Sequence, residues 1–503
     1  MDTIRFKNYR CFDDTKEIEI KPLTFLLGSN SSGKSSFLKF FPLLKQSMGL
    51  RRNGTFLWLG NNVDFKDFKN TVKNGRGNMT IEFSFNNFKC RSNSPFDEEI
   101  YHDNKCTMHI SVVLASKDES YDYIKEFVLE YLDQKVKVSC RKTNVGSVEI
   151  NGFKLPEEYS ECMIFSNSNL LPDLLFTGNN DKGSKMWTST NTWARERIEN
   201  IIGKNKEFIS KYRYNDFHTP MFLSQSQFAD LVRSKHKKLK DDQIEQLNNY
   251  YILVHLNNII DGVNDGVVSL CSRMSYIKPL RATTERYYRY QNYAIDEIDS
   301  DGKNLAMYLA NLSKASREAF SEWLAELFDF RLQVTPIEGH VVINVEEKDK
   351  PLRNIVDVGF GYTQILPVVA IIWKALEIDS RPKYHSWTYD TNEHLVIIEQ
   401  PELHLHPKMQ GQFAEMLLRV LKSARKKNRD IRFIIETHSD VMINKIGELL
   451  ATDFADSDVN ADDTNVILFN VKENGKGYVE TTSYNSDGSL KYWPLGFLSS
   501  YAD

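Results

Sequence analysis

The chain lacks the features that mark secreted, metal-binding and membrane proteins. Its six cysteines are scattered over 503 residues, and no two of them form a CxxC pair. This pattern argues against a disulfide framework, a zinc site or a zinc-hook dimer, and it fits a reducing cytoplasm. The N-terminus has no apolar signal segment, and no run reaches the roughly 18 apolar residues of a membrane span. We therefore expect a cytoplasmic protein with no membrane partner.

An excess of charge of one sign is lacking as well. The formal net charge is −4, with 26% charged and 41% hydrophobic residues, as in a globular protein. The molecule as a whole is not a polycation, so any contact with DNA or RNA must come from local basic patches. The densest is Arg233–Lys240, and Arg286–Tyr290 mixes cations with aromatic rings, as nucleic-acid grooves do. DNA or RNA therefore stays open as a partner.

One short stretch carries a chemical signature. Gly28–Ser35 reads G-S-N-S-S-G-K-S, which matches the pattern G-x-x-x-x-G-K-S. The apolar run Leu23–Leu27 before it is typical of a buried strand, and Ser36–Phe41 after it opens a helix. A strand, a glycine-rich turn and a helix start are the setting of a P-loop, whose backbone N–H groups and helix dipole hold phosphate. ATP and Mg²⁺ are thus the expected ligands.

The P-loop pattern predicts what its residues do. Lys34 would reach the β- and γ-phosphates and act in catalysis, and Ser35 would hold Mg²⁺. The residues expected to contact the nucleotide are Gly28, Asn30, Ser31, Ser32, Gly33, Lys34, Ser35 and Ser36.

A P-loop needs a second, acidic site for Mg²⁺, and the end of a later apolar run supplies it. Leu395–Ile398 is continuous and apolar, like a buried parallel strand, and Glu399 follows directly. Ligands gather at the carboxyl ends of parallel strands, so Glu399 is predicted to lie near Ser35 and the metal ion. The next apolar run, Ile431–Ile435, leads to His438, which is suited to contact a γ-phosphate.

A second glycine-rich turn precedes another helix. Gly359, Gly361 and Thr363 come just before the apolar helix predicted over Ile365–Leu376. Glycines at a helix N-terminus form an anion-binding site, so these three residues are predicted to bind nucleotide.

The residue after the predicted acidic ligand is Gln400. A glutamine can orient a water molecule but cannot act as a general base. Either the protein hydrolyses ATP slowly with Gln400, or Glu402 takes part, or position 400 carries an engineered trap. We favour slow hydrolysis, with Gln400 in a catalytic role beside Lys34, Glu399 and His438.

The order of these motifs resembles that of ABC-type ATPase heads, above all the branch that holds the SMC and OLD-like proteins. Three further stretches, residues 276–281, 399–407 and 487–497, resemble a prokaryotic family of AAA-like ATPases from antiphage systems. The resemblance is strongest to the Septu ATPases (PtuA), which also occur in some retrons, and it covers about residues 1–50 and 275–503. It implies an α/β fold: an ABC-type P-loop NTPase head with a mixed sheet, plus a mainly helical insertion.

The resemblance also implies partners. Two copies would form a head-to-tail homodimer, or a higher oligomer, with ATP between the P-loop of one subunit and Gly359–Thr363 of the other. Residues 401–407 would lie at the interface. The ATPase would regulate or scaffold an HNH-type nuclease (PtuB). We do not expect the chain itself to be a nuclease, because the segment after His438 is short for a further domain.

Other functions are open. An SMC-like DNA-repair or recombination ATPase would have a long coiled coil, which the pattern does not predict. An ATPase sensor of a PARIS-like system would have a TOPRIM partner. A transporter subunit is disfavoured by the long interval between Ser35 and Asp357, and a toxin acting alone would need a catalytic site that we do not find.

The hydrophobic pattern divides the chain into three parts: an N-terminal lobe over residues 1–154, a mainly helical insertion over 155–274, and a C-terminal lobe over 275–503. Strands are predicted at residues 4–8, 16–20, 79–88, 106–114, 135–141, 147–150, 330–334 and 341–345, with a hairpin over 465–482. Helices are predicted over 193–212, 224–235, 241–270 and 305–327, and a loop over 166–192.

Overall fold

The structure, a computed structural model, describes residues 1–88, 106–116, 121–141, 144–155, 163–165, 169–179, 185–188, 192–202, 223–281, 285–290, 295–377, 393–452, 454, 458–472 and 475–493. The chain forms two compact units. Unit 1 consists of Met1–Glu19, Leu43–Ser272 and Pro382–Thr391, and unit 2 of Ile20–Pro42, Arg273–Arg381 and Asn392–Asp503. The three-part division stays a prediction.

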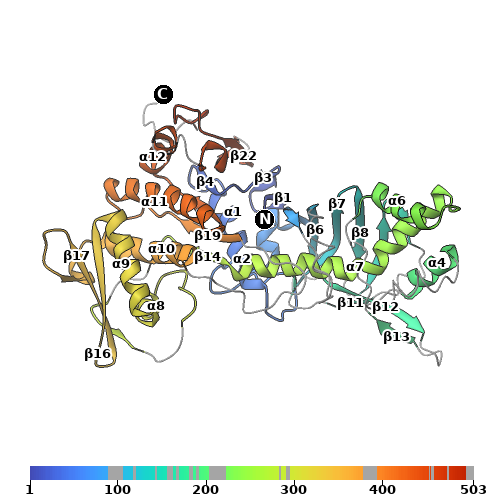
Figure 1. Cartoon of the computed structure of the whole chain (residues 1–503), viewed down its shortest axis with the longest axis horizontal. Helices are drawn as coiled ribbons and strands as arrows, with labels where there is room; N and C mark the ends of the chain where they lie inside the picture. The colour runs from blue at the N-terminus through green and yellow to red at the C-terminus, as the bar shows by residue number, and fades with distance from the viewer. Residues whose placement is uncertain are drawn as a thin grey trace. The chain divides into compact units, whose positions relative to one another are not determined.

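Unit 1 contains an antiparallel sheet in the order β10-β9-β8-β7-β6-β5-β1-β2, with β3 beside β1 (Figure 1). Its strands are β1 (Thr3–Tyr9), β2 (Phe12–Asp14), β3 (Ile18–Glu19), β5 (Met79–Phe88), β6 (Cys106–Ser116), β7 (Asp122–Tyr131), β8 (Gln134–Cys140), β9 (Val145–Ile150) and β10 (Phe153–Lys154). The strands predicted at residues 4–8, 79–88, 106–114, 135–141 and 147–150 are confirmed, and of 16–20 the structure has the short β3. The sheet also contains β7, whose alternating pattern was not assigned to a strand, and the short β2.

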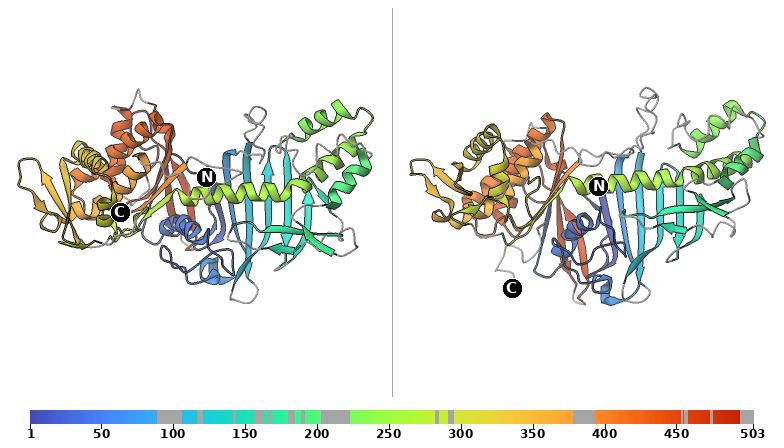
Figure 2. Two further views of the ribbon diagram at one scale, coloured as in Figure 1. Left: turned by 60° about the horizontal axis from the view of Figure 1, so that its bottom comes forward. Right: turned by 90° about the horizontal axis from the view of Figure 1, so that it is seen from below.

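The helix α7 (Asp241–Ser272) runs along the sheet of unit 1 (Figure 2). Two buried asparagines of α7 form hydrogen bonds with backbone groups of Leu171 and Leu174, in place of another backbone segment. Asn257 bonds to the N–H and C=O of Leu174 at 3.0 and 2.7 Å, and Asn264 bonds to those of Leu171 at 2.8 and 2.9 Å. These bonds satisfy polar groups that burial would otherwise leave unpaired. The predicted helix over 241–270 is confirmed.

The remaining elements of unit 1 include a small three-stranded sheet in the order β11-β12-β13. The loop predicted over 166–192 is therefore wrong at β12 and β13, because a Ser/Asn-rich composition does not prevent pairing between neighbouring segments. The elements are β11 (Met163–Phe165), β12 (Asp173–Asn179), β13 (Lys185–Thr188), α3 (Phe68–Thr71), η1 (Lys73–Gly75), α4 (Thr192–Ile202) and α6 (Gln225–Lys235). Residues 203–212 of a predicted helix lie outside the described residues.

Unit 2 is built on a mixed sheet in the order β22-β21-β4-β20-β19-β14. Its strands are β4 (Leu23–Gly28), β14 (Met274–Ile277), β19 (Glu393–Glu399), β20 (Asp430–Glu436), β21 (Thr464–Val471) and β22 (Gly477–Thr482). All neighbours are parallel except β22, which forms the predicted hairpin with β21. The predicted α/β fold with a mixed sheet is confirmed.

Helices cover both faces of this sheet, which explains why its strands are apolar without alternation. Leu23, Phe25 and Leu27 of β4 pack into one core with residues of α8 to α12. On the other face, Phe37 of α1 packs against Phe469 of β21, with ring centroids 5.5 Å apart. The helices of unit 2 are α1 (Lys34–Leu38), α8 (Leu305–Asn311), α9 (Lys314–Phe328), α10 (Phe360–Glu377), α11 (Pro407–Lys426) and α12 (Asp440–Ala451). The boundary between the units falls within α2 (Phe40–Ser47).

The single helix predicted over 305–327 is two helices. Leu312 is extended, and the Ser313 hydroxyl caps α9 by accepting a bond from the Ser316 N–H at 3.0 Å. A small sheet in the order β15-β17-β16 lies beside α8 and α9. Its strands are β15 (Tyr288–Arg289), β16 (Phe330–Ile337), β17 (His340–Glu347) and β18 (Arg353–Asn354), and the short helix η3 (Ile355–Asp357) lies beside β17. Another short helix, η4 (Ala461–Asp463), directly precedes β21. None of the helices in the described ranges combines the length and the apolar character needed to cross a bilayer.

Candidate functional site

The P-loop begins where β4 ends, and its shape requires glycine there. Gly28 has φ +142°, and a Cβ at this position would lie 2.1 Å from the carbonyl oxygen of Phe469. Asn30 and Ser31 are exposed at the tip of the loop. Gly33, with φ +106°, turns the chain into α1. The strand, turn and helix that the sequence predicts are therefore all present.

Within this loop, Lys34 lies beneath the exposed tip. Its side chain is almost fully buried, and its Nζ donates hydrogen bonds of 2.8 Å to the carbonyl oxygens of Gly28 and Ser29. Burial lowers the pKa of Lys34, and the negative charge of Glu436 opposes this shift. The ammonium group is held inside the loop that would enclose phosphate.

The hydroxyl of Ser35, at the start of α1, donates a 2.9 Å hydrogen bond to Oε1 of Glu436. Glu436 ends β20, which lies between β4 and β19. Glu399, the acid that the sequence assigns to the metal ion, ends β19 one strand further away. Sequence reasoning did not assign Glu436, although it ends an apolar run as Glu399 does.

The two acids are register partners at the ends of adjacent parallel strands. Burial, followed by the charge of Glu399, raises the pKa of Glu436 to about 7. Burial also raises the pKa of Glu399, whose Oε1 accepts a 2.6 Å bond from the Tyr276 hydroxyl. Two buried carboxylates this close favour a cation between or beside them.

This donor set fits Mg²⁺. The second carboxylate oxygen of Glu436 is buried and has no hydrogen-bond partner among the residues that the structure describes. Mg²⁺ prefers hard oxygen ligands, typically one or two carboxylates together with phosphate oxygens. In the described ranges, no group of three or more His, Cys, Asp and Glu side chains is placed to hold a metal ion. The oxygen ligands available at this site are the hydroxyl of Ser35 and the carboxylates of Glu436 and Glu399.

The turn after β19 is fixed by its backbone. Gln400 has φ +44°, and its N–H donates a 2.7 Å bond to the carbonyl oxygen of Glu436. The carbonyl of the same peptide group, that of Glu399, accepts a 3.3 Å bond from Nη2 of Arg281. Both polar groups of the peptide before Gln400 are therefore held, so the backbone position from which the Gln400 side chain extends is fixed.

Glu402 links this turn to the end of β20. Its two carboxylate oxygens accept 2.8 Å bonds, one from the Thr437 hydroxyl and one from the backbone N–H of His438. Glu402 thereby holds the backbone of His438. Both of its oxygens are engaged in these bonds, and a role of Glu402 in hydrolysis stays a prediction. His438 is half-buried, and burial and the charge of Lys34 lower its pKa. A neutral imidazole beside the P-loop is suited to contact phosphate.

The three residues predicted to bind nucleotide at the second glycine-rich turn have different surroundings. Gly359 is exposed, and a Cβ there would have no atom within 4 Å. Gly361 is constrained, since its Cβ would lie 3.3 Å from the carbonyl oxygen of His404. Thr363 is buried and donates a 2.7 Å bond to the carbonyl of Phe360, so its hydroxyl belongs to the first turn of α10.

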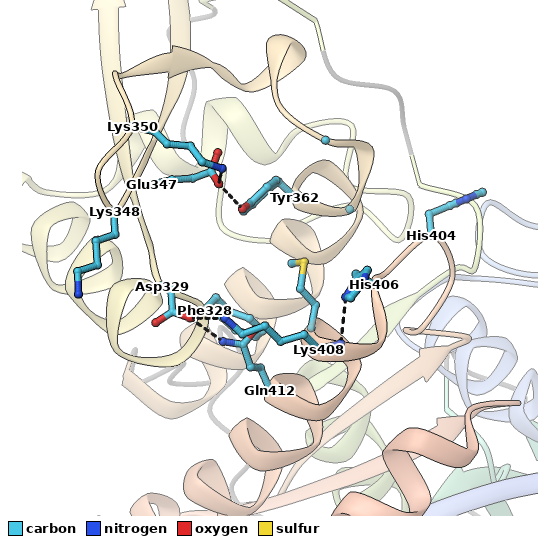
Figure 3. A pocket seen from close by; sticks show the side chains of 13 residues that line it. Phe328, Asp329, Glu347, Lys348, Lys350, Tyr362, His404, His406, Lys408 and Gln412 are labelled. Carbon is cyan, nitrogen blue, oxygen red and sulfur yellow. Dashed lines mark hydrogen bonds and ion pairs between the residues drawn. The ribbon is translucent and has the colours of Figure 1, made fainter.

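A pocket of about 450 Å³ adjoins this turn (Figure 3). Its polar groups are largely paired with each other. Glu347 accepts bonds from Lys350 and Tyr362 at 2.6 and 3.1 Å, and Asp329 accepts from Lys408 at 3.0 Å. The lining residues are Phe328, Asp329, Glu347, Lys348, Lys350, Gly359, Gly361, Tyr362, His404, His406, Lys408, Met409 and Gln412.

The two basic patches of the sequence lie in different units. In unit 1, Arg233 pairs with Asp241 at 2.7 Å, while Lys235, Lys237 and Lys238 are exposed. In unit 2, the guanidinium of Arg286 forms two hydrogen bonds with Asp357, at 2.9 and 2.5 Å. The patches remain candidates for nucleic-acid contact.

Three comparisons place the chain among known proteins. It is 22% identical over 458 residues to endonuclease GajA of Bacillus cereus (strain HuB5-5); the match covers 88% of this chain and 56% of that protein. The Smc head domain of Pyrococcus furiosus, solved with an extended coiled coil and the C-terminal domain of ScpA, covers 96% of both chains at 13% identity and a TM-score of 0.36. The SMC head domain of Thermotoga maritima covers 95% of this chain and 97% of its own at 10% identity and a TM-score of 0.30.

The third comparison is with protein families. The model of the AAA ATPase domain family matches residues 1–443. The match includes the P-loop, the turn at Gly359, the acidic ends of β19 and β20, and His438. The family match supports the predicted α/β P-loop ATPase fold. Because the match spans most of the sequence, the chain belongs to the AAA ATPase domain family.

Proposed function

We propose that this protein binds and slowly hydrolyses ATP, and that its nucleotide state controls a partner nuclease in prokaryotic antiphage defence. The observation that carries the proposal is the hydrogen bond from Ser35 to Glu436, which joins the P-loop helix to the acidic end of β20. Family membership supports the ATPase part. The defence role rests on the sequence resemblance to Septu ATPases.

In the proposed mechanism, the P-loop holds ATP through its backbone N–H groups and through Lys34. Ser35, Glu436 and Glu399 would hold Mg²⁺, which neutralises phosphate charge when bound. Lys34 would exchange its bonds to Gly28 and Ser29 for phosphate oxygens. His438, whose backbone Glu402 fixes, would contact the γ-phosphate.

Slow hydrolysis follows from Gln400. Its amide orients water but takes no proton, so the protein lacks the general base that a carboxylate at this position would supply. Both polar groups of the preceding peptide are held, which fixes the backbone from which the Gln400 amide would reach the water. A site of this kind keeps ATP bound for long periods, as a sensor requires.

We further propose a head-to-tail dimer or higher oligomer. Gly359 and Phe360 are exposed at the start of α10, where the N–H groups of a helix favour an anion. ATP held by the P-loop of one subunit would meet this turn of another. The partner that we favour is an HNH-type nuclease. A TOPRIM partner, as in PARIS-like systems, and an SMC-like DNA-repair role are the alternatives.

The relative named as an endonuclease supports a link to nuclease action. The chain spans only 56% of that protein's length, so its activity is not transferred to this chain. We propose that DNA cleavage belongs to a separate subunit. Incubating the purified protein with plasmid DNA, alone and with the product of the neighbouring gene, tests this; cleavage by the chain alone would overturn it.

The central experiment compares wild-type protein with Lys34→Ala and with Lys314→Ala, which removes an exposed lysine of α9. Lys34→Ala should abolish ATP binding, ATP hydrolysis and protection of cells against phage, whereas Lys314→Ala should keep all three. Protection that survives Lys34→Ala would contradict control by nucleotide. ATP-dependent dimerisation is measured by light scattering on the same proteins.

A further inference from the structure

Arg281 is a buried cation beside the proposed hydrolytic site. It follows β14 and is 6% exposed, while its neighbour Leu280 is 74% exposed. This reverses the usual preference, since arginine is rarely buried without a partner and leucine is usually inside. The chain therefore turns a guanidinium inward at the carboxyl end of the sheet, where α/β proteins bind their ligands.

The guanidinium of Arg281 has unused donors. Nη2 bonds to the carbonyl oxygen of Glu399, but Nε and Nη1 are buried without a hydrogen-bond partner in the part of the chain that the structure describes. Glu402 is the acid whose charge acts on it, yet both Glu402 oxygens already accept other bonds. Burial lowers the pKa of Arg281 to about 10, so it is cationic at neutral pH. A buried donor without an acceptor costs free energy, and a bound ligand that supplies the acceptor removes this cost.

Gln400 shares a peptide group with the carbonyl that Arg281 holds. Enzymes that transfer phosphoryl groups to water without a carboxylate base use two parts: a glutamine that orients the water, and an arginine that neutralises the charge on the phosphoryl oxygens, supplied in some cases by the same chain. Gln400 and Arg281 are these two residue types, brought together at the end of β19.

We propose that Arg281 is a catalytic residue of this ATPase, which donates hydrogen bonds to the γ-phosphoryl oxygens during hydrolysis while Gln400 orients the water. The proposal rests on the ATPase function proposed above. The water oxygen attacks the γ-phosphorus, and the bond from that phosphorus to the β–γ bridging oxygen breaks, leaving the electron pair on ADP. The water proton passes to a phosphoryl oxygen and then to solvent, so the products are ADP and inorganic phosphate. Arg281 and Gln400 undergo no net change.

The test uses full-length wild-type protein, Arg281→Ala, Arg281→Lys and the control Arg429→Ala. Arg429 also donates to a backbone carbonyl, that of Ala375 at 3.1 Å, but it lies just before β20, at the opposite end of that strand. The measurements are kcat for ATP, the affinity for a slowly hydrolysed ATP analogue, and trapping of ADP with aluminium fluoride, which mimics the transferred phosphoryl group. Thermal melting checks that each variant folds.

Arg281→Ala should lower kcat by roughly 1,000-fold or more, the lower end of the range that such arginines contribute. It should abolish trapping, leave analogue affinity within about threefold, and regain activity when guanidinium ion is added at millimolar concentration. Arg281→Lys keeps the positive charge but not the forked arrangement of guanidinium donors, and it should therefore retain only part of the wild-type rate. Arg429→Ala should behave as wild type.

Two results would overturn the proposal: unchanged kcat in Arg281→Ala, or lost kcat with normal trapping and no rescue, which would make Arg281 a positioning residue for Gln400. If Arg281→Ala fails to fold, Arg281→Lys carries the same decision, because a wild-type rate in it excludes a need for the forked guanidinium. Wild-type protein that hydrolyses no more ATP than Lys34→Ala would instead refute the ATPase function itself.

Discussion

Oε1 of Glu436 accepts a 2.9 Å hydrogen bond from the hydroxyl of Ser35, across 401 positions of sequence. The bond fixes the first turn of α1 against the end of β20, and the parallel pairing of β20 with β19 places a second carboxylate, that of Glu399, one strand away. The strength of this bond depends on the charge of Glu436, because a hydrogen bond to an ionised carboxylate is stronger than one to a neutral acid.

Glu436→Gln separates these roles. The amide oxygen of the introduced side chain would still accept the bond from Ser35, but the negative charge that attracts Mg²⁺ would be lost. We expect the Mg²⁺ concentration for half-maximal ATPase activity to rise by about tenfold or more, because even residues that only orient metal ligands typically contribute on this scale. Glu415→Gln, on the surface of α11, is the control. Equal Mg²⁺ requirements in the two variants would count against Glu436 as a ligand.

Gln400→Glu should speed hydrolysis. A carboxylate at this position supplies the general base that glutamine lacks, and such bases contribute roughly 100-fold or more to rate. Single-turnover hydrolysis with saturating ATP measures the chemical step. If Gln400 already acts with Arg281 as proposed, the gain will be larger in Arg281→Lys than in wild type. A rate that stays at the wild-type level would argue that chemistry is not limited by a missing base.

Gly28→Ala should prevent stable folding of the P-loop. A Cβ there would be 2.1 Å from the Phe469 carbonyl, in a backbone region that L-residues avoid. We expect a loss of more than about 2 kcal/mol in the free energy of unfolding, since backbone strain and a fixed clash add. Gly359→Ala, where a Cβ meets open space, should change stability by less than about 0.5 kcal/mol. Urea unfolding compares the two; similar losses would refute the distinction.

The Arg5–Asp14 pair predicts a pH dependence in unit 1. Hydrogen bonds of 2.8 and 2.6 Å from Arg5 hold the pKa of Asp14 well below its ordinary value. The ionised carboxylate therefore stabilises the folded state above the unfolded pKa of about 3.9, and this contribution is lost as pH falls below that value.

Asp14→Asn should lower the free energy of unfolding by about 1 kcal/mol at pH 7, a modest figure because both side chains are more than a quarter exposed. Its stability should approach that of wild type at pH 3. Asp13→Asn, at the neighbouring position, removes a more exposed carboxylate and is the control. Denaturant titrations at both pH values measure the free energy of unfolding. If the difference between Asp14→Asn and wild type grew toward low pH, the stabilising role of the ionised Asp14 would be refuted.

Much of the fold and the P-loop follow from local pattern, whereas the pairing of the two acids does not. The strand β5 and the two strands of the tail hairpin are visible from alternation and from continuous apolar runs. Nothing local in the sequence says that β20 lies between β4 and β19, which is why Glu399 was assigned to Ser35 and Glu436 was not. The signal that was present, an acid at the end of each apolar run, did not specify their order across the sheet.

Other differences have the same origin in non-local contacts. The strands β12 and β13 pair with each other in a stretch whose composition favours turns. The break between α8 and α9 depends on the backbone at Leu312, which helical periodicity does not detect. Arg281 was noted as part of a resemblance, but its burial and its contact with Glu399 required the parallel pairing of β14 with β19.

The asparagines of α7 have a consequence for how this protein can change during evolution. From Asn257 to Asn264 the helix rises by about 10.5 Å, and the extended chain from Leu171 to Leu174 spans about 10 Å. The two lengths match, so both asparagines pair at once. A one-residue insertion between them would rotate the second by about 100° and break its bonds. The number of residues between the two asparagines is therefore fixed by the segment with which they pair.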